Sequence, residues 1–400
     1  MLRRPLLATT AAASAALLLS ATSNCAAESR GEPTQRRRGN VPLADKHRVA
    51  LSAWTVMGAK WGGAPQVQTL EGLMRHVALS GYDGIEINVA QLRKLYFDEG
   101  ASDRAVVRAA QAAARSAGLD GAAVATGSLL HVTDGGPTTG VAAVHFDWAQ
   151  EDLEGRISAA LEADKQLGAG YATFQLHLPP SKMSTGGAYR RDSAYIALCA
   201  QRIATLQRLC FKLGLNCYLE THYGRITEDP AATVAILEQC EEEIELNGDL
   251  SHYIFRGIKQ GQLLDRILDR VGHTHQRLAK HYGDLSADVR DLRGDWKQKG
   301  LTYDAWKMFK RATVQGLSSR TIVGETGALH LVDGPRSLQL DAQLVPLWRM
   351  FARHADAMVA ADDRGQSNNP FSSGGGEDSE MRQLKQLLAK TEELLREAEN

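Results

Sequence analysis

The chain of 400 residues is 44% hydrophobic and 23% charged, which is typical of a soluble globular protein with a sizeable core. Its formal net charge is −1, and its pI is near 6.9. Proteins that bind nucleic acid or anionic membranes usually carry a basic excess, so these values argue against nucleic acid as the main partner.

The N-terminus predicts a targeting peptide. Residues 1–27, MLRRPLLATTAAASAALLLSATSNCAA, contain two arginines, no acidic residue and a run of Ala, Leu, Ser and Thr, as export signals and organelle transit peptides do. Thr and Ser interrupt the apolar part, which is too short for a stable membrane span. We expect delivery to an organelle (plastid or mitochondrion) or export, with residues 28–45 as a linker.

Between residues 46 and 361, short apolar runs alternate with helical stretches. Eight runs have the length and composition of buried strands, and several of the helices between them end in glycine. The predicted strands are residues 49–56, 83–89, 121–127, 171–178, 215–222, 243–249, 271–278 and 320–327. Eight βα units fit a single (β/α)8 TIM barrel of the α/β class better than a doubly wound sheet, which usually has five or six strands.

The C-terminal stretch has a different composition. Residues 362–379 are rich in Gly, Ser, Asn and Asp and predict a flexible linker. Residues 380–399 carry a leucine stripe at spacings of three and four, which predicts an amphipathic helix or short coiled coil. This helix could dock on the barrel, bind a partner helix or join two copies of the chain.

Polar residues gather at the carboxyl ends of the predicted strands, where the active sites of TIM barrels lie. Taken singly, each would more often be a solvated acid or a satisfied core histidine. Together they suit a divalent cation, because buried acids are costly unless a charge compensates them. The residues are Glu86, Gln175, His177, Glu220, His222, Asp249, His252, His273, His275, Arg277 and Glu325.

Five stretches in order resemble the strand-end motifs of a known family. They are GYDGIEIN, YLETHYGRITEDP, GDLSHY, GHTHQR and IVGETG. The chain resembles the xylose isomerase-like TIM barrels, the sugar phosphate isomerase/epimerase group, over nearly the whole barrel. The resemblance implies a single divalent metal bound by an acid after strand 5, an acid after strand 6, a histidine on strand 7 and a glutamate on strand 8.

Carried over to this chain, the implied metal ligands are Glu220, Asp249, His275 and Glu325. Three carboxylates with one imidazole favour Mn or Mg, with Co or Zn as alternatives. The resemblance also implies that His252 binds substrate oxygen. Side chains three residues apart on a strand face opposite ways, so the strand must end near Asp249 for Asp249 and His252 to share a pocket. Further substrate-binding candidates are Arg277, His177, His222 and Glu86.

The predicted function is isomerisation or epimerisation of a sugar or sugar phosphate. A metal that binds a carbonyl and the neighbouring hydroxyl acidifies the adjacent C–H and stabilises a cis-enediolate. Glu220 and Glu325, as the catalytic pair, could then remove a proton from one face and return it to the other face or to the next carbon.

Two other functions stay open at this point. The barrel could be a non-catalytic scaffold that acts through its C-terminal helix, although an intact set of four ligands argues against this. The same superfamily includes apurinic endonucleases, which use three zinc ions and an Asp-x-His pair soon after the strand 7 histidine. That pair is absent after His275.

Overall fold

The computed structural model describes most of the barrel and little outside it. The described residues are 46–121, 124–133, 144–177, 191–222, 224–240, 244–255, 262–276, 317–325 and 334–362, with a few single residues elsewhere. The predicted targeting peptide, the first linker and Arg277 lie outside them, as does the second linker apart from its first residue, Asp362, which ends the last long helix. They stay predictions.

Eight parallel strands close into a barrel. Seven pairings in the sheet order and an additional β2–β3 pairing complete the ring β1-β2-β3-β5-β6-β7-β8-β9. The strands are β1 (Arg48–Ser52), β2 (Gly84–Glu86), β3 (Ala125–Thr133), β5 (Tyr171–Leu176), β6 (Asn216–Glu220), β7 (Glu245–Asn247), β8 (Val271–Gln276) and β9 (Thr321–Gly324). The (β/α)8 barrel predicted from the alternation of apolar runs is confirmed.

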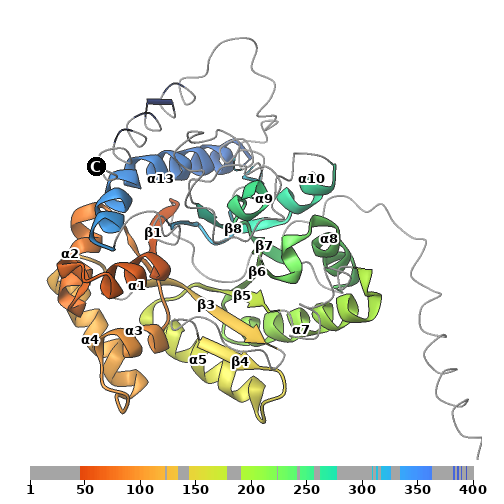
Figure 1. Ribbon diagram of the computed structural model, residues 1–400, viewed down its shortest axis with the longest axis horizontal. Helices are drawn as coiled ribbons and strands as arrows, with labels where there is room; N and C mark the ends of the chain where they lie inside the picture. The colour runs from red at the N-terminus through yellow and green to blue at the C-terminus, as the bar shows by residue number, and fades with distance from the viewer. Residues whose placement is uncertain are drawn as a thin grey trace, which may run out of the picture. The chain divides into compact units, whose positions relative to one another are not determined.

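Helices follow the strands and lie outside them (Figure 1). The helices are α1 (Ala53–Trp61), α2 (Leu70–Ser80), α3 (Val89–Tyr96), α4 (Asp103–Ser116), α5 (Leu153–Leu167), α7 (Ser193–Lys212), α8 (Pro230–Gln239), α9 (Ser251–Phe255), α10 (Gln262–Leu268) and α13 (Gly334–Asp362), with short 3-10 turns at Pro65–Val67 and Ile226–Glu228. Within the described residues, no helix is long and apolar enough to cross a membrane.

Three local features differ from the predicted strands. The first strand ends at Ser52 instead of residue 56, because the Ser52 hydroxyl accepts a hydrogen bond from the Trp54 amide and caps α1. β3 runs to Thr133, six residues past the predicted end at residue 127. An unpredicted strand, β4 (Val144–Asp147), pairs in parallel with the end of β3.

The last long helix ties the two ends of the barrel together. Arg349 of α13 makes a bidentate ion pair with Asp83, with Nη1–Oδ2 and Nη2–Oδ1 distances of 2.6 and 2.8 Å. Asp83 also accepts from the Val49 amide at 2.8 Å. Tyr82 donates to the buried Asp341 carboxylate of α13 at 2.6 Å. These contacts hold the closing helix against β1 and the start of β2.

The C-terminal stretch 380–399 is described at five positions only. Each is helical and exposed: Arg382, Lys385, Gln386, Ala389 and Glu393. These residues share one face at helical spacing, and that face is polar. The leucines of the stripe lie outside the described residues, so the amphipathic helix and its pairing with another helix stay predictions.

Aromatic rings fill the barrel interior beneath the site. The rings of Tyr171, Tyr218 and His273 pack on one another, with centroid separations of 4.2 to 5.7 Å. Gly127 of β3 leaves room for the Tyr171 ring, which a Cβ at that position would overlap. The absence of a Cβ at Gly127 is therefore required for Tyr171 to reach the site above it.

Replacing Gly127 by Ala should destabilise the barrel by about 1–3 kcal/mol, the usual range for overpacking a close-packed interior. Urea denaturation followed by circular dichroism would measure the change. Gly100→Ala is the matched control, since a Cβ at Gly100 meets nothing within 4 Å. Equal midpoints for the two variants would show that Tyr171 does not need this space.

Candidate active site

A buried carboxylate, Glu86, lies at the centre of the polar network in the barrel. Its Oε1 lies 2.8 Å from Nε2 of His275, and its Oε2 lies 3.1 Å from Nε2 of His273. Oε2 also accepts from the Tyr171 hydroxyl at 2.8 Å. The strands bring these groups together from β2, β5 and β8. Both oxygens of Glu86 are therefore engaged, and the His275 ring is held from one side.

The other nitrogen of His275 faces carboxylates. Its Nδ1 lies 3.2 Å from Glu220 Oε1 and 3.6 Å from Glu325 Oε2. His275 is buried, and its Nδ1 is in ion-pair contact with Glu220. Two carboxylates and an imidazole nitrogen thus converge on one point, and either a proton on His275 or a cation beside Nδ1 would balance their charge.

Glu220 ends β6 and has a second partner. Gln175 of β5 donates from Nε2 to Glu220 Oε2 at 2.7 Å, and Arg225 donates from Nε to Gln175 Oε1 at 3.1 Å. Oε1 is left to face His275. Gln175 thus fixes the orientation of the carboxylate without neutralising its charge.

Asp249 and His252 meet because the strand before them is short. β7 ends at Asn247 and α9 begins at Ser251, so the chain turns between the acid and the histidine. His252 Nε2 lies 3.1 Å from Asp249 Oδ2, and the Ser251 hydroxyl donates to Asp249 Oδ1. Both side chains are buried. The structure thus meets the demand that the strand end near Asp249.

Glu325 lies directly after β9, with its amide donating to the Gln276 carbonyl at 3.1 Å. Its Oε1 accepts from the Ser52 hydroxyl at 3.3 Å, and its Oε2 faces His275. Ser52 ends β1, and Glu325 follows β9. The first and last strands of the barrel therefore place side chains at the same point. Glu325 is buried.

The electrostatics follow from this packing. Burial would raise the pKa of Glu86, but His275 and His273 lower it well below its usual value. Burial would lower the pKa of His275, but Glu86 and Glu220 raise it well above its usual value. In the metal-free protein a proton on His275 therefore balances the surrounding acids, and a cation at Nδ1 would replace it.

The residues fit a divalent cation. Glu220, Asp249 and His275 each offer a ligand atom within 4.8 Å of the others. Glu325 lies beside this group through its contact with His275. Carboxylate oxygens with a single imidazole suit Mn²⁺ or Mg²⁺. The excess of acids over the single His275 imidazole at this point is the observation that favours a bound ion over a simple ion-pair network.

Comparison with known proteins places the chain in a family. Residues 74–281, just over half of the chain, match the family model described as Xylose isomerase-like TIM barrel. The chain belongs to the xylose isomerase-like TIM barrel family. The resemblance carried by the five strand-end motifs is confirmed. No curated protein matches the sequence.

Solved structures of similar fold are distant in sequence. A 3-keto-D-glucoside 4-epimerase from E. coli is 16% identical, covers 70% of this chain and 92% of its own, and has a TM-score of 0.41. A D-allulose 3-epimerase from Methylomonas sp. is 14% identical, with coverages of 77% and 98% and a TM-score of 0.46. A sugar phosphate isomerase/epimerase from Parabacteroides distasonis is 12% identical, with coverages of 80% and 96% and a TM-score of 0.46.

Of the remaining predicted site residues, the structure brings one close to this centre and places another apart from it. His222 is half-buried, and its ring centroid lies 4.0 Å from that of His252. His177 lies apart from the Glu220 group, against His131, with their ring centroids 4.8 Å apart. Arg277 lies outside the described residues.

Three contributors to the interior were missed or misread from the sequence. Tyr171 begins a predicted strand and is not among the predicted site residues, yet its hydroxyl donates to Glu86. His131 and His145 lie on the extension of β3 and on β4, outside the predicted strands. The alternation in LHVT, residues 130–133, is the local signal that could have placed His131 on a strand.

Replacing Glu86 by Gln should weaken Mn²⁺ binding roughly 10–100-fold, the range seen when an outer partner of a metal-ligating histidine is lost. The neutral amide cannot hold His275 and His273 as the carboxylate does. Titration with Mn²⁺ by calorimetry would measure the change, with the exposed Glu71→Gln as the control. An unchanged affinity in Glu86→Gln would contradict a role for Glu86 in positioning His275.

Proposed function

We propose that this chain is a metal-dependent isomerase or epimerase of a sugar or sugar phosphate. The observation that carries the proposal is the convergence of three buried ligand atoms, from Glu220, Asp249 and His275, within 4.8 Å of one another, with Glu325 beside His275 at 3.6 Å. Membership of the xylose isomerase-like family supports it. The metal ligands we assign are Glu220, Asp249, His275 and Glu325.

A bound divalent ion, Mn or Mg with Co or Zn as alternatives, supplies Lewis acidity that polarises a carbonyl and acidifies the adjacent C–H. The residues around it orient this centre. Glu86 and Tyr171 fix the His275 ring from below, and Ser251 fixes Asp249. Because both oxygens of Glu86 are engaged, we now assign it a positioning role in place of direct substrate binding.

Glu220 and Glu325 are the groups we assign to proton transfer. They approach His275 from strands that are not neighbours, β6 and β9, so they flank the centre from two directions. One carboxylate removes the proton next to the carbonyl, giving a cis-enediolate, and the other returns a proton to the opposite face or to the next carbon. Isomerisation and epimerisation thus need the same two acids.

His252 and His222 are the groups we assign to substrate oxygens. Both lie close to Glu220, since one nitrogen from each histidine falls within 4.8 Å of a Glu220 oxygen. Each imidazole can donate to a hydroxyl or accept from it. Arg277 stays a candidate for an anionic group of the substrate on the basis of its charge.

A barrel with only a structural role would not need buried carboxylates and imidazoles in its interior. Buried carboxylates and imidazoles weaken a core unless they are paired. The three buried acids near His275 would be replaceable by packed apolar residues at no loss of stability. This favours the enzyme over a scaffold that acts through its C-terminal helix. It does not favour an apurinic endonuclease, since the net charge of −1 gives no attraction to a phosphate backbone.

Replacing Glu325 or Glu220 by Gln should slow exchange of the sugar C–H proton with solvent by about 10²–10⁴-fold, because each acts as an acid or base. Incubating the Mn²⁺-loaded protein with a panel of ketoses and their phosphates in D₂O, followed by NMR, would measure this. The exposed Glu162→Gln is the matched control. Wild-type exchange rates in Glu325→Gln would overturn the assignment of that residue, and no exchange with any ketose in the wild type would overturn the proposed function.

A further inference from the structure

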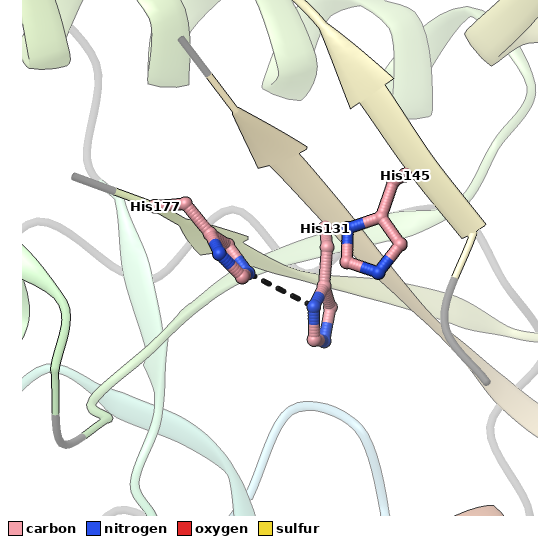
Figure 2. Close-up of side chains that lie close together, drawn as sticks. All are labelled: His131, His145 and His177. Atoms are coloured by element: carbon pink, nitrogen blue, oxygen red, sulfur yellow. Dashed lines mark hydrogen bonds between the residues drawn. The ribbon is translucent and has the colours of Figure 1, made fainter. Parts of the chain in front are cut away.

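Three histidines lie on neighbouring strands on the side of the barrel formed by β3, β4 and β5. His131 of β3 pairs in register with His145 of β4 and with Gln175 of β5. His177 follows Gln175 by two positions, so its side chain points to the same face as Gln175. Figure 2 shows the three imidazoles turned toward one another.

The distances between these rings are those of a ligand cluster. The ring centroids of His131 lie 5.0 Å from His145 and 4.8 Å from His177, and His145 and His177 are 5.7 Å apart. One nitrogen from each histidine lies within 4.8 Å of the others. His177 Nε2 and His131 Nδ1 are hydrogen-bonded at 2.9 Å, which Figure 2 marks with a dashed line.

One buried nitrogen of this cluster lacks a hydrogen-bond partner. His131 is buried, and its Nε2 has no hydrogen-bond partner in the structure. Such an atom costs about 1–3 kcal/mol, which a bound ligand would offset. Each imidazole has two nitrogens, so three of them offer more donors and ligand atoms than they use on one another. If their role were packing alone, apolar side chains of similar size would serve as well.

We propose that His131, His145 and His177 form a second metal site, which takes a borderline transition metal such as zinc. Three imidazoles without a carboxylate suit Zn, Co, Ni or Cu and not Mg, Ca or Mn. Tetrahedral zinc has Zn–N distances of about 2.0–2.1 Å, which sets ligand nitrogens about 3.4 Å apart. One nitrogen from each histidine lies within 4.8 Å of the others, so side-chain rotation must draw these atoms together, and the His131–His177 hydrogen bond gives way to the ion.

The local electrostatics allow this. Burial, with the nearby imidazoles and Arg225, lowers the pKa of His131, and burial with Arg225 lowers the pKa of His177 to about 3. Neutral imidazoles are the form that binds metal, so no proton competes at neutral pH. Arg225 carries a positive charge near the cluster. The negative charges of Glu220 and Glu228 both partly offset it.

A zinc ion held by three histidines keeps a fourth position for water or a ligand oxygen. The site is joined to the Glu220 centre by a short chain, because Gln175 contacts Glu220 and Arg225, and Arg225 pairs with His177 across an isolated bridge. A ligand oxygen of an anionic or polyhydroxy substrate could therefore be held at one end by the second metal. The proposal does not depend on the chemistry proposed for Glu220.

The test is zinc content and affinity of the full chain in a background that lacks the first site. Asp249→Ala removes a ligand of the carboxylate centre, and zinc-buffered titration then counts the remaining ions per chain. We expect one zinc, which His145→Ala or His177→Ala removes. The affinity should fall by more than the roughly 10–100-fold that an outer partner costs. His76→Ala, a half-buried histidine on α2 that contacts Ser80, is the matched control and should keep the ion.

Two variants keep the test decisive if one fails to fold, and thermal melting by circular dichroism identifies such a failure. Unchanged zinc binding in both His145→Ala and His177→Ala would overturn the proposal, as would no zinc in Asp249→Ala alone. If the wild type binds one zinc that His145→Ala removes and Asp249→Ala does not, the second site stands and the carboxylate centre holds no zinc, which leaves its Mn²⁺ binding to be judged separately by the same Asp249→Ala comparison in Mn²⁺.

Discussion

The hydrogen bond between Glu86 Oε1 and His275 Nε2, at 2.8 Å inside a closed barrel, is the constraint on which the site depends. It fixes one nitrogen of His275 and thereby aims the other at Glu220 and Glu325. Held in this way, the ring keeps Nδ1 at the point where the two carboxylates converge, which is where the proposed cation would lie.

The barrel supports this constraint from below and from its seam. The Tyr171 and Tyr218 rings and His273 fill the interior under Glu86, and the lack of a side chain at Gly127 admits the first of these rings. At the seam, Arg349 of α13 binds Asp83, which directly precedes the strand that carries Glu86. Close packing makes these positions rigid, so small displacements would reach the site.

Sequence reasoning found what is local. The eight strands are set by short apolar runs, and Glu220, Asp249 and Glu325 stand at or just after strand ends that alternation and turn residues mark. It did not find contacts between distant strands, such as Tyr171 with Glu86. Nor did it find β4, because His145 lies in a short run outside the eightfold alternation, and the three-histidine cluster exists only once β3, β4 and β5 are paired.

The central claim is that a divalent ion lies among Glu220, Asp249, His275 and Glu325. Anomalous diffraction from crystals of the full chain grown with Mn²⁺, recorded at the manganese absorption edge, would test it most directly. The account predicts one peak at bonding distance from His275 Nδ1 and from the carboxylates of Glu220, Asp249 and Glu325. The absence of a peak in the barrel, or a peak that touches none of these side chains, would contradict it.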